Sequence, residues 1–586
     1  MMELTGDKVS LNGCMWCLLN ADERSVQTLM QKMNLPEIVA RLLVLRGVDA
    51  QTADSFLYPR LKTHLPNPDT LKDMQKSANR VADAIEQGEP IGIMGDYDVD
   101  GATSTAILKM FLQSLGVQVY TFIPDREDGY GPNAPKMHEY KELGCSVVLT
   151  LDCGTTAYDA IETGTDLGLD VIILDHHNAE IVLPRCYGVV NPKRLDEPVD
   201  HPCHHLAACG VVFLFVIALN ACLRQRGFYR DKTEPNLMQY LDLVAFGTVC
   251  DVVHLRGVNR LLVKSGLQQF QKNQNKGIYA LCQCANINEP IQAYHLGYIL
   301  GPRINACGRV GKSDLGMKLL SCSDEIQASI LAQELDGLNL ARREIEADVM
   351  LQAIEQVESD TRERTFIFVK GENWHQGVVG IVAGRLKERY NLPVLVMSVE
   401  GDEVKGSARS VMGVDIGTII MNAVTKGYLT RGGGHPMAAG FSLTKEQLPA
   451  FENYLNEMIT IDKLPSGPAQ INVDGILDLG GVSWDLAEQL DLLAPYGDGN
   501  NEPTFVIKNV TLGHVNLLKN GHISCSLTNM SGQRLNAIAF KVADTHLGQT
   551  FLKGLGQKFH ILGTLKKDVW NGRKKVQLQI QDAMSV

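Results

Sequence analysis

Acidic residues and histidines follow four apolar runs between residues 90 and 251 of this 586-residue chain. They are Asp96, Asp98 and Asp100, then Asp152, then His176 and His177 directly after Asp175, and finally Asp251. Carboxylate oxygens with few imidazole nitrogens form a ligand set that suits Mn²⁺ or Mg²⁺ better than Zn²⁺. The chemistry indicated is therefore that of a site for divalent cations.

Three of the apolar runs, residues 90–94, 146–151 and 170–174, are typical of buried parallel strands. In an open α/β sheet the site lies beyond the carboxyl ends of the strands, so these side chains should converge in one crevice. Two carboxylates ~4 Å apart near a protein surface repel by about 4 kcal/mol, and divalent cations cancel that repulsion. Two cations also neutralise the charge that builds on a phosphoryl group during in-line attack. The pattern predicts metal-assisted hydrolysis of a phosphodiester.

The segment Asp96–Gly101 also begins like the calcium-binding loop of an EF-hand. That loop requires a bidentate Glu at its twelfth position, where this chain has Ile107. The calcium-loop interpretation is therefore rejected.

Further motifs follow in order along the chain. They are Asp175-His176-His177, the segment GPRINACGR at 301–309, WHQGVVGI at 374–381, GSARS at 406–410 and GGHPMAAG at 433–440. Together they resemble the DHH phosphoesterase superfamily, and within it the RecJ family of single-strand-specific 5′→3′ DNA exonucleases. The resemblance spans roughly residues 80 to 505.

This resemblance implies a role for each residue of the acidic series. The expected ligands of two Mn²⁺ or Mg²⁺ ions are Asp96, Asp98, Asp100, Asp152, His176 and Asp251. Asp152 would bridge the two ions, and His177 would donate a hydrogen bond to the phosphate or the leaving oxygen. Many relatives carry a His where this chain has Met94, and Met is a poor ligand for hard cations. The first ion is therefore expected to depend on Asp96 or on water.

The resemblance also implies substrate-binding residues. Arg303 and Arg309, with Asn305 as an amide partner, would contact phosphate oxygens. Ser407, Arg409 and His435 would hold a 5′ phosphate, and Tyr130 would stack on a base, which contributes ~1–3 kcal/mol per base. Without the motifs, an arginine at any of these positions would more often be part of a surface ion pair.

The expected architecture is α/β, with a parallel-sheet catalytic domain, a helical connector, a smaller α/β domain and a C-terminal β-barrel. The predicted divisions are an N-terminal segment at 1–85, the DHH domain at 86–260, a helical region at 261–360, the DHHA1 domain at 361–460 and an OB-fold-like domain at 470–586. Within them, residues 103–115, 157–167 and 313–359 are expected to be helical. Strands are expected at 365–370 and 393–398, and five more form the barrel, at 504–510, 522–527, 535–540, 558–565 and 575–580. The dipeptide Asn571-Gly572 predicts a tight hairpin turn.

Composition describes an ordinary globular protein, with 45% hydrophobic and 21% charged residues. The longest apolar stretch, residues 211–219, is expected to be too short to span a bilayer, and no signal peptide is visible. We therefore expect a cytoplasmic protein without membrane contact, whose fourteen cysteines are thiols. Cys14 and Cys17 form one CxxC pair without a second pair at zinc-ribbon spacing, so packing is the simpler interpretation.

The net charge of −12 is unusual for a protein that binds DNA, but the charge is uneven. Residues 502–586 hold eleven Lys or Arg and four acidic residues, which leaves +7 there and −19 elsewhere. We therefore expect the C-terminal barrel, with a basic hairpin at 570–575, to bind the strand.

Two other functions remain open at this point. A DHH hydrolase of short or cyclic oligonucleotides would share the metal cluster, but such proteins are compact and usually lack the barrel. A noncatalytic replication or repair scaffold would typically have lost metal ligands that are present here. The expected partner is single-stranded DNA, with a single-strand-binding protein and a RecQ-type helicase implied by the resemblance, and the chain is expected to be a monomer.

Overall fold

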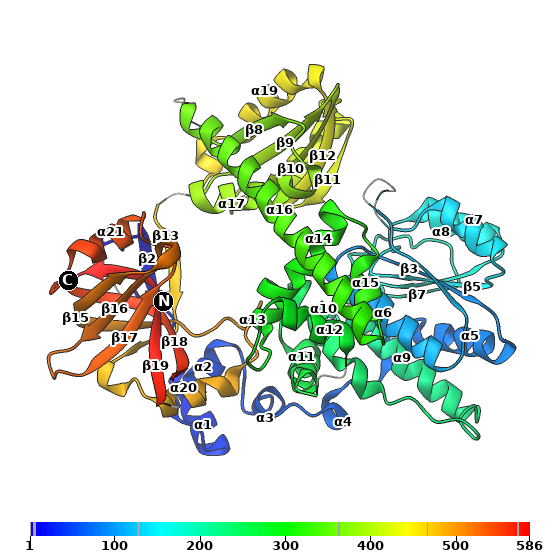
Figure 1. Cartoon of the computed structure of the whole chain (residues 1–586), viewed down its shortest axis with the longest axis horizontal. Coiled ribbons are helices and arrows are strands. Elements are labelled where there is room, and N and C mark those ends of the chain that lie inside the picture. Colours follow the sequence, from blue (N-terminus) through cyan, green and yellow to red (C-terminus); the bar gives the residue numbers. More distant parts are fainter. Residues whose placement is uncertain are drawn as a thin grey trace.

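The computed structural model describes residues 2–3, 8–125, 129, 131–272, 275–360, 364–465, 467–570 and 573–586. Figure 1 shows three bodies, an α/β body on the right, a smaller α/β body at the top and a β-barrel on the left that carries both chain ends. The long helix α16 (Glu325–Ser359) runs from the first body to the second. The predicted α/β class and its order of parts are therefore present.

The first body is built on a five-stranded, wholly parallel sheet of order β4-β3-β5-β6-β7. Its strands are β3 (Ile91–Gly95), β4 (Val119–Phe122), β5 (Val147–Leu151), β6 (Asp170–Leu174) and β7 (Gly188–Val190). The three predicted strands correspond to β3, β5 and β6. Every residue of β3 and β5 is buried, as expected where helices cover both faces of a parallel sheet.

The helices of this body pack on the two faces of the sheet. Residues of α5 (Met74–Gln87), α6 (Val99–Ser114), α9 (Ala208–Gln225) and α10 (Leu241–Cys250) form one core, and residues of α7 (Ala134–Glu142) and α8 (Tyr158–Asp166) form the other. The helices predicted at 103–115 and 157–167 are thus α6, which begins four residues earlier, and α8.

Helix α9 corrects one expectation. Its 18 residues make it long and apolar enough to cross a membrane, although the stretch at 211–219 was expected to be too short. However, 78% of that helix is buried inside the protein, where it packs against α5, α6 and α10. A buried core helix accounts for its apolar composition.

The region expected to be helical at 313–359 contains two helices. α15 (Leu315–Leu320) ends before Ser321, and α16 begins after Asp324, whose side chain accepts a hydrogen bond from the backbone N–H of Gln327 at 2.7 Å. This N-terminal cap starts the new helix, since it satisfies a backbone donor that lacks a helical partner. The helical connector itself is therefore α16 alone.

The second α/β body is a five-stranded sheet of order β11-β12-β10-β9-β8. Its strands are β8 (Ile367–Glu372), β9 (Val394–Glu400), β10 (Glu403–Arg409), β11 (Arg431–His435) and β12 (Ala438–Thr444). Helix α17 (Gln376–Tyr390) lies against β9 and β10, while α18 (Ile416–Thr425) and α19 (Leu448–Met458) contribute to the core on the other side. All five residues of the edge strand β11 are exposed.

The third body is the predicted barrel, with strand order β14-β15-β16-β17-β19-β18 and closure by pairing of β15 with β18. Its strands are β14 (Gly475–Leu477), β15 (Phe505–Leu517), β16 (Ile523–Thr528), β17 (Arg534–Ala539), β18 (Lys558–Trp570) and β19 (Arg573–Ser585). The five predicted strands are β15 to β19. The Asn571-Gly572 turn between β18 and β19 lies outside the described residues.

The segment 1–85 does not form a unit of its own. Strand β2 (Cys14–Leu18) pairs with β13 (Ala469–Val473), and α1 (Glu23–Met33), α2 (Glu37–Leu45) and α3 (Ala53–Leu57) share a core with the barrel. By contrast, α5 packs into the first body. The local sequence carries no signal for this division, because it depends on partners more than 400 residues away.

Arg260 joins the barrel side of the molecule to the first body. It lies on α11 (Gly257–Phe270) and is 1% exposed. Its guanidinium donates to the backbone carbonyls of Phe56 at 2.9 Å, Leu493 at 2.9 Å and Ala494 at 2.8 Å, and it lies 3.8 Å from the centre of the Phe56 ring. One buried cation thus satisfies carbonyls from two distant parts of the chain.

Replacing Arg260 with Met should therefore destabilise this junction. Each carbonyl left buried without a donor costs about 1–3 kcal/mol, so we expect a loss of about 3 kcal/mol or more in the free energy of unfolding. Urea denaturation measures this loss, and Arg24→Met on the exposed side of α1 is the matched control, expected to stay within about 0.5 kcal/mol of wild type. Equal stability of the two variants would contradict the role given to Arg260.

Candidate metal centre

The loop after β3 places the first acidic residues. Asp98 caps helix α6, since its Oδ1 accepts from the backbone N–H of Gly101 at 3.0 Å. Asp100 lies in the first turn of α6 and is 1% exposed. Its two carboxylate oxygens accept from the first backbone N–H groups of α9, those of Ala208 at 2.6 Å and Cys209 at 2.9 Å. The amino end of α9 thus orients Asp100, because its N–H groups have no partner within the helix.

A glycine makes room for this contact. A Cβ at Gly247 on α10 would lie 2.9 Å from Asp100 Oδ1 and 2.4 Å from Thr103 Oγ1. Any larger residue would push α10 away from the carboxylate. Close approach of α10 brings its last residue and the following Asp251 to the cluster.

His176 lies at the centre of three carboxylates. Its Nε2 is 3.3 Å from Asp152 Oδ1, 3.6 Å from Asp251 Oδ2 and 3.8 Å from Asp100 Oδ2. Asp152 follows β5 and has a positive φ of 61°, a strained backbone for a non-glycine residue that turns the chain behind the strand. Asp251 follows α10 and not a strand. The sheet and one helix therefore converge here.

Three groups of these residues each have ligand atoms within 4.8 Å of one another. They are Asp152 with His176 and His177, Asp100 with His176 and Asp251, and Asp96 with Asp98 and Asp152. Asp152 and His176 each belong to two of the groups. The predicted site residues of the first body are thus brought together.

Burial makes this cluster costly without cations. Burial, and next the neighbouring carboxylates, raise the pKa of Asp96 to about 8 and that of Asp251 to about 9. The same causes raise the pKa of Asp152 well above its ordinary value, while burial lowers that of His176. Among the described residues, Asp96 Oδ1, both ring nitrogens of His176 and Asp251 Oδ2 are buried without a hydrogen-bond partner. Buried oxygen and imidazole atoms in this state fit divalent cations that favour oxygen ligands.

Asp175 contacts both histidines of the cluster, although it was not among the predicted site residues. It is 1% exposed, and its Oδ1 lies 2.7 Å from His177 Nδ1 and accepts from the backbone N–H of His176 at 2.7 Å. Asn191 supports the same loop, since its Nδ2 donates to the carbonyl of His177 at 2.9 Å. The first letter of the Asp-His-His triplet was the available signal for Asp175, whereas nothing in the sequence singles out Asn191.

Asp175 and His177 form an ion pair in which a buried carboxylate lies beside a protonated imidazole. Burial alone would lower the pKa of His177, but the hydrogen bond and charge of Asp175 raise it to about 9. The same contact holds the pKa of Asp175 well below its ordinary value, against the effect of burial. In the metal-free protein, His177 therefore carries a proton near neutral pH, and Nε2 is its donor on the side away from Asp175.

Met94 takes no part in this cluster. It is 1% exposed and packs with Met137 and Tyr140 in the core on the α7 and α8 side of the sheet. Asp96, which was expected to compensate for Met94, lies within 4.8 Å of the ligand atoms of Asp98 and Asp152. The position of Asp96 therefore makes it available as a ligand of the first ion, whereas Met94 is not a candidate ligand.

The two arginines of α14 (Gly301–Val310) have different surroundings. Arg303 Nε donates to Asp336 on α16 at 2.8 Å, and its Nη1 donates to the carbonyl of Ile299 at 2.6 Å. Arg309 Nη1 donates to the carbonyl of Gly377 at the start of α17, which links the first two bodies. Arg303 thus forms a structural ion pair, the alternative to phosphate binding considered from the sequence. Arg309 lies at the junction of the first two bodies. Asn305 is half-buried on the same helix.

In the second body, Ser407, Arg409 and His435 lie on one face of the sheet. Arg409 and His435 are both paired with Ala438 across β12, so they occupy one rung, about 10 Å apart. Arg409 Nη1 donates to Ser407 Oγ at 3.0 Å and to the carbonyl of Ala408 at 2.8 Å. Arg409 makes no ion pair with any acid in the described part of the chain. Burial lowers its pKa.

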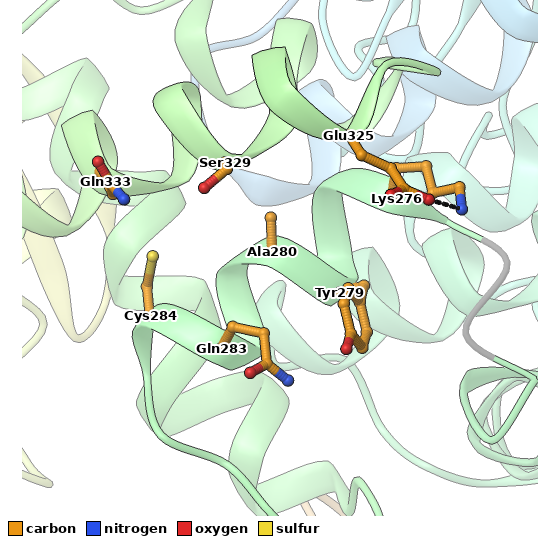
Figure 2. A pocket seen from close by; sticks show the side chains of 8 residues that line it. All are labelled: Lys276, Tyr279, Ala280, Gln283, Cys284, Glu325, Ser329 and Gln333. Atoms are coloured by element: carbon orange, nitrogen blue, oxygen red, sulfur yellow. Dashed lines mark hydrogen bonds and ion pairs between the residues drawn. The ribbon is translucent and has the colours of Figure 1, made fainter.

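Neither Tyr130 nor the groove beside residues 276–284 is part of the metal cluster described above. Tyr130, the expected stacking residue, lies outside the described residues. A groove of ≈ 430 Å³ lies between α12 (Lys276–Cys284) and α16, and Figure 2 shows its lining, with the ion pair of Lys276 and Glu325 at one end. None of its lining residues belongs to the acidic cluster.

The fold and this cluster define a phosphoesterase of the DHH class. The family described as "DHH family, N-terminal domain" matches residues 90–248, the "DHHA1 domain" matches 363–460 and the "RecJ OB domain" matches 473–582. The chain is similar to the protein named "Single-stranded-DNA-specific exonuclease RecJ" of Bacillus subtilis (strain 168), with 34% identity over 97% of this chain and 70% of that protein. The protein of the same name from Escherichia coli (strain K12) is 34% identical over 88% of this chain and 90% of that protein.

Solved structures agree with these matches. The crystal structure of RecJ in complex with Mn²⁺ from Thermus thermophilus has a TM-score of 0.81 and 28% identity, and covers 97% of this chain and 79% of that chain. The structure of the complex with Mg²⁺ from the same organism has a TM-score of 0.74 and 27% identity, and covers 97% of this chain and 78% of that chain. The chain belongs to the RecJ family. The resemblance inferred from the motifs and the predicted architecture are thereby confirmed.

Asp175→Asn should shift the titration of His177 in the metal-free protein. The wild-type imidazole keeps its proton up to about pH 9 and loses it as the pH rises further, because the folded-state pKa is raised. The variant removes the charge responsible, so His177 should titrate near or below its ordinary pKa, which is ~6.5. NMR of labelled histidine rings in EDTA measures this, with Asp159→Asn on exposed α8 surface as the control. A His177 that still titrates near 9 would contradict the role of Asp175.

Proposed function

We propose that the protein is a single-stranded-DNA-specific 5′→3′ exonuclease that releases mononucleotides by metal-assisted hydrolysis, in DNA recombination and repair. The observation that carries this proposal is the buried cluster around His176, in a chain that also has the DHHA1 and RecJ OB domains. The relatives named above are called single-stranded-DNA-specific exonucleases, and two solved relatives contain Mn²⁺ or Mg²⁺. We assign Mn²⁺ or Mg²⁺ to this chain on that support.

The ligands form two sets that share Asp152. Asp96, Asp98 and Asp152 would hold one cation, and Asp100, His176, Asp251 and again Asp152 would hold the other. When bound, such cations offset the charge that builds on the phosphoryl group during attack. The chain's own contribution is to keep these carboxylates at short spacing and out of water.

Protonated His177 supplies a side-chain donor in this arrangement. Its Nδ1 is bound to Asp175, so its Nε2–H is the group that can donate to a phosphate oxygen or the departing oxygen. A cation at this position stabilises negative charge on the phosphoryl group. Asp175 therefore acts as the residue that orients His177.

The second body supports the 5′ polarity. Arg409 and His435 lie on one rung with Ser407 nearby, and Arg409 has no carboxylate to neutralise it among the described residues. Beside them, a Cβ at Gly380 on α17 would lie 3.1 Å from Ser407 Oγ, so the glycine leaves the polar groups accessible. A terminal 5′ phosphate suits this set of donors, and the first linkage of the strand would then lie towards the metal centre.

The basic residues of the barrel support strand binding, but several lysines of β18 and β19 are already in ion pairs. A basic hairpin was expected at residues 570–575. On β18 before that hairpin, Lys566 lies 2.6 Å from Glu502, and Lys567 pairs with Asp491. Lys574 is 3.9 Å from Glu488 and 5.0 Å from the Trp484 ring on α20 (Trp484–Leu490). The exposed residues of the tail that have no ion pair among the described residues are Lys508, Lys519, Arg534, Lys541, Lys553, Lys558 and Lys575. We therefore place the strand-binding charge on these residues, of which Lys575 belongs to the hairpin.

Protein partners and location are proposals as well. A RecQ-type helicase would supply single strands and a single-strand-binding protein would cover them, in agreement with the proposed substrate. All fourteen cysteines are free thiols, which supports a reducing cytoplasm. We propose a monomer in that compartment.

The test is cleavage of single strands labelled at either end, with Mn²⁺, beside matched duplex and dinucleotides. We expect mononucleotides from the 5′ end of the single strand alone, and Asp152→Ala should abolish release while strand binding persists. The control Asp242→Asn replaces a buried acid of α10 outside the cluster and should retain activity. Cleavage of dinucleotides only would favour a short-substrate hydrolase, and binding without cleavage would favour a scaffold.

Arg409→Ala should weaken the preference for a 5′ phosphate. Loss of a charge-assisted contact costs about 1.5–3 kcal/mol, so KM for a 5′-phosphorylated strand should rise by roughly 10- to 100-fold. KM for the 5′-hydroxyl strand should change little. Arg303→Ala is the comparison, because Asp336 already occupies that guanidinium. Equal losses on both strands would remove Arg409 from a 5′-phosphate site.

A further inference from the structure

The turn behind Asp251 is strained. Val252 follows this ligand with a φ of 58°, although it is β-branched. The left-handed conformation costs an ordinary L-residue roughly 1–2 kcal/mol. Val252 is 67% exposed, so burial of its own side chain does not offset the cost. Such residues persist where their surroundings determine the backbone.

The surroundings are a loop from the barrel side of the molecule, residues 497–500, which we call the clasp. The backbone N–H of Leu255 donates to the carbonyl of Asp498 at 2.8 Å, and Arg256 Nε donates to the carbonyl of Gly499 at 2.9 Å. The Asp498 carboxylate lies 2.5 Å from His254 Nδ1. Three consecutive residues after the strained turn are therefore held by two consecutive residues of the clasp.

The clasp fits closely and is itself anchored. Gly499 has a φ of 68°, and a Cβ there would lie 2.9 Å from His254 Nδ1. Buried Asn500 donates from Nδ2 to the carbonyls of Leu493 at 2.9 Å and Pro495 at 2.8 Å, and its Oδ1 accepts from Arg46 Nε at 2.9 Å. Only four residues separate the clasp from β15, so its position follows that of the barrel and of α2.

We propose that the clasp positions Asp251, so that docking of the barrel completes the second cation site. This inference rests on the assignment of cations in the proposed function. Asp498 and Gly499 touch neither substrate nor cation and act through residues 252–256. If the clasp is released, Val252 relaxes to an ordinary φ, and the carboxylate of Asp251 leaves its place 3.6 Å from His176 Nε2. Outer contacts of this kind typically change metal affinity by about 10- to 100-fold.

The experiment is a titration of the full chain with Mn²⁺ alone and without DNA. Electron paramagnetic resonance measures the bound Mn²⁺ at each step. Gly499→Ala, which places a methyl group against His254, should weaken one of two bound ions by about 10-fold. Asp498→Ala, which keeps the backbone contacts, should weaken the same ion to a smaller extent. Asn501→Ala, an exposed neighbour whose side chain makes no described contact, should bind both ions as wild type does. Unchanged affinity in both clasp variants would overturn the proposal.

A second variant separates positioning from general damage to the fold. Val252→Gly removes the strain, so adding it to Asp498→Ala should restore the affinity of the weakened ion. Failure to restore it would overturn the proposal, and this pair decides the matter if Gly499→Ala does not fold. Wild-type protein that binds two ions but leaves single strands intact would refute the proposed function and leave the clasp standing.

Discussion

Mutual repulsion of buried carboxylates is the constraint on which this structure depends. Asp100 and Asp152 are at most 2% exposed, and water therefore cannot screen them from each other or from Asp251. Near a protein surface each pair at ~4 Å costs about 4 kcal/mol, and at such depth the cost is greater. Without cations, the raised pKa values of Asp96 and Asp251 mean that bound protons relieve this repulsion, and cations would take the place of those protons. Metal binding and folding of this region are accordingly linked.

Several local features of the scaffold place the carboxylates of this cluster. Gly247 lets α10 approach Asp100, the amino end of α9 donates two N–H groups to the same carboxylate, and Asp152 adopts a positive φ. Val252 adds another positive φ directly after Asp251. The positive φ values cost stability locally, whereas the N–H groups of α9 stabilise the charge of Asp100, and each of these features places or admits a carboxylate. Strain at a site is thus a consequence of bringing together charges that would otherwise separate.

The sequence predicted those parts of the structure that depend on local pattern. Strands β3, β5 and β6 are largely apolar, and an acidic residue follows each, so both the sheet and the convergence of Asp98, Asp152 and His176 could be predicted. The division of segment 1–85 could not, because α1 packs on a barrel that begins more than 400 residues later. The ion pairs of Lys567 and Lys574 could not be predicted for the same reason, because their partners Asp491 and Glu488 lie in a different element of the chain. The role of Arg260 could not be predicted from the sequence, because its partners are backbone carbonyls, which every residue carries.

The arginines show how geometry separates residues that the motifs treat alike. Arg303 and Arg409 both stand in family motifs, and both were expected to contact phosphate. Asp336 already offsets the charge of Arg303, so a phosphate there would have to displace a carboxylate and gain little. Arg409 is half-buried, and its described partners are the neutral oxygens of Ser407 and Ala408. A guanidinium that is partly removed from water without a neutralising acid binds an anion more strongly than one that is already paired. This difference in charge balance is why we propose the 5′-phosphate site on the second body, with cleavage of the strand from that end.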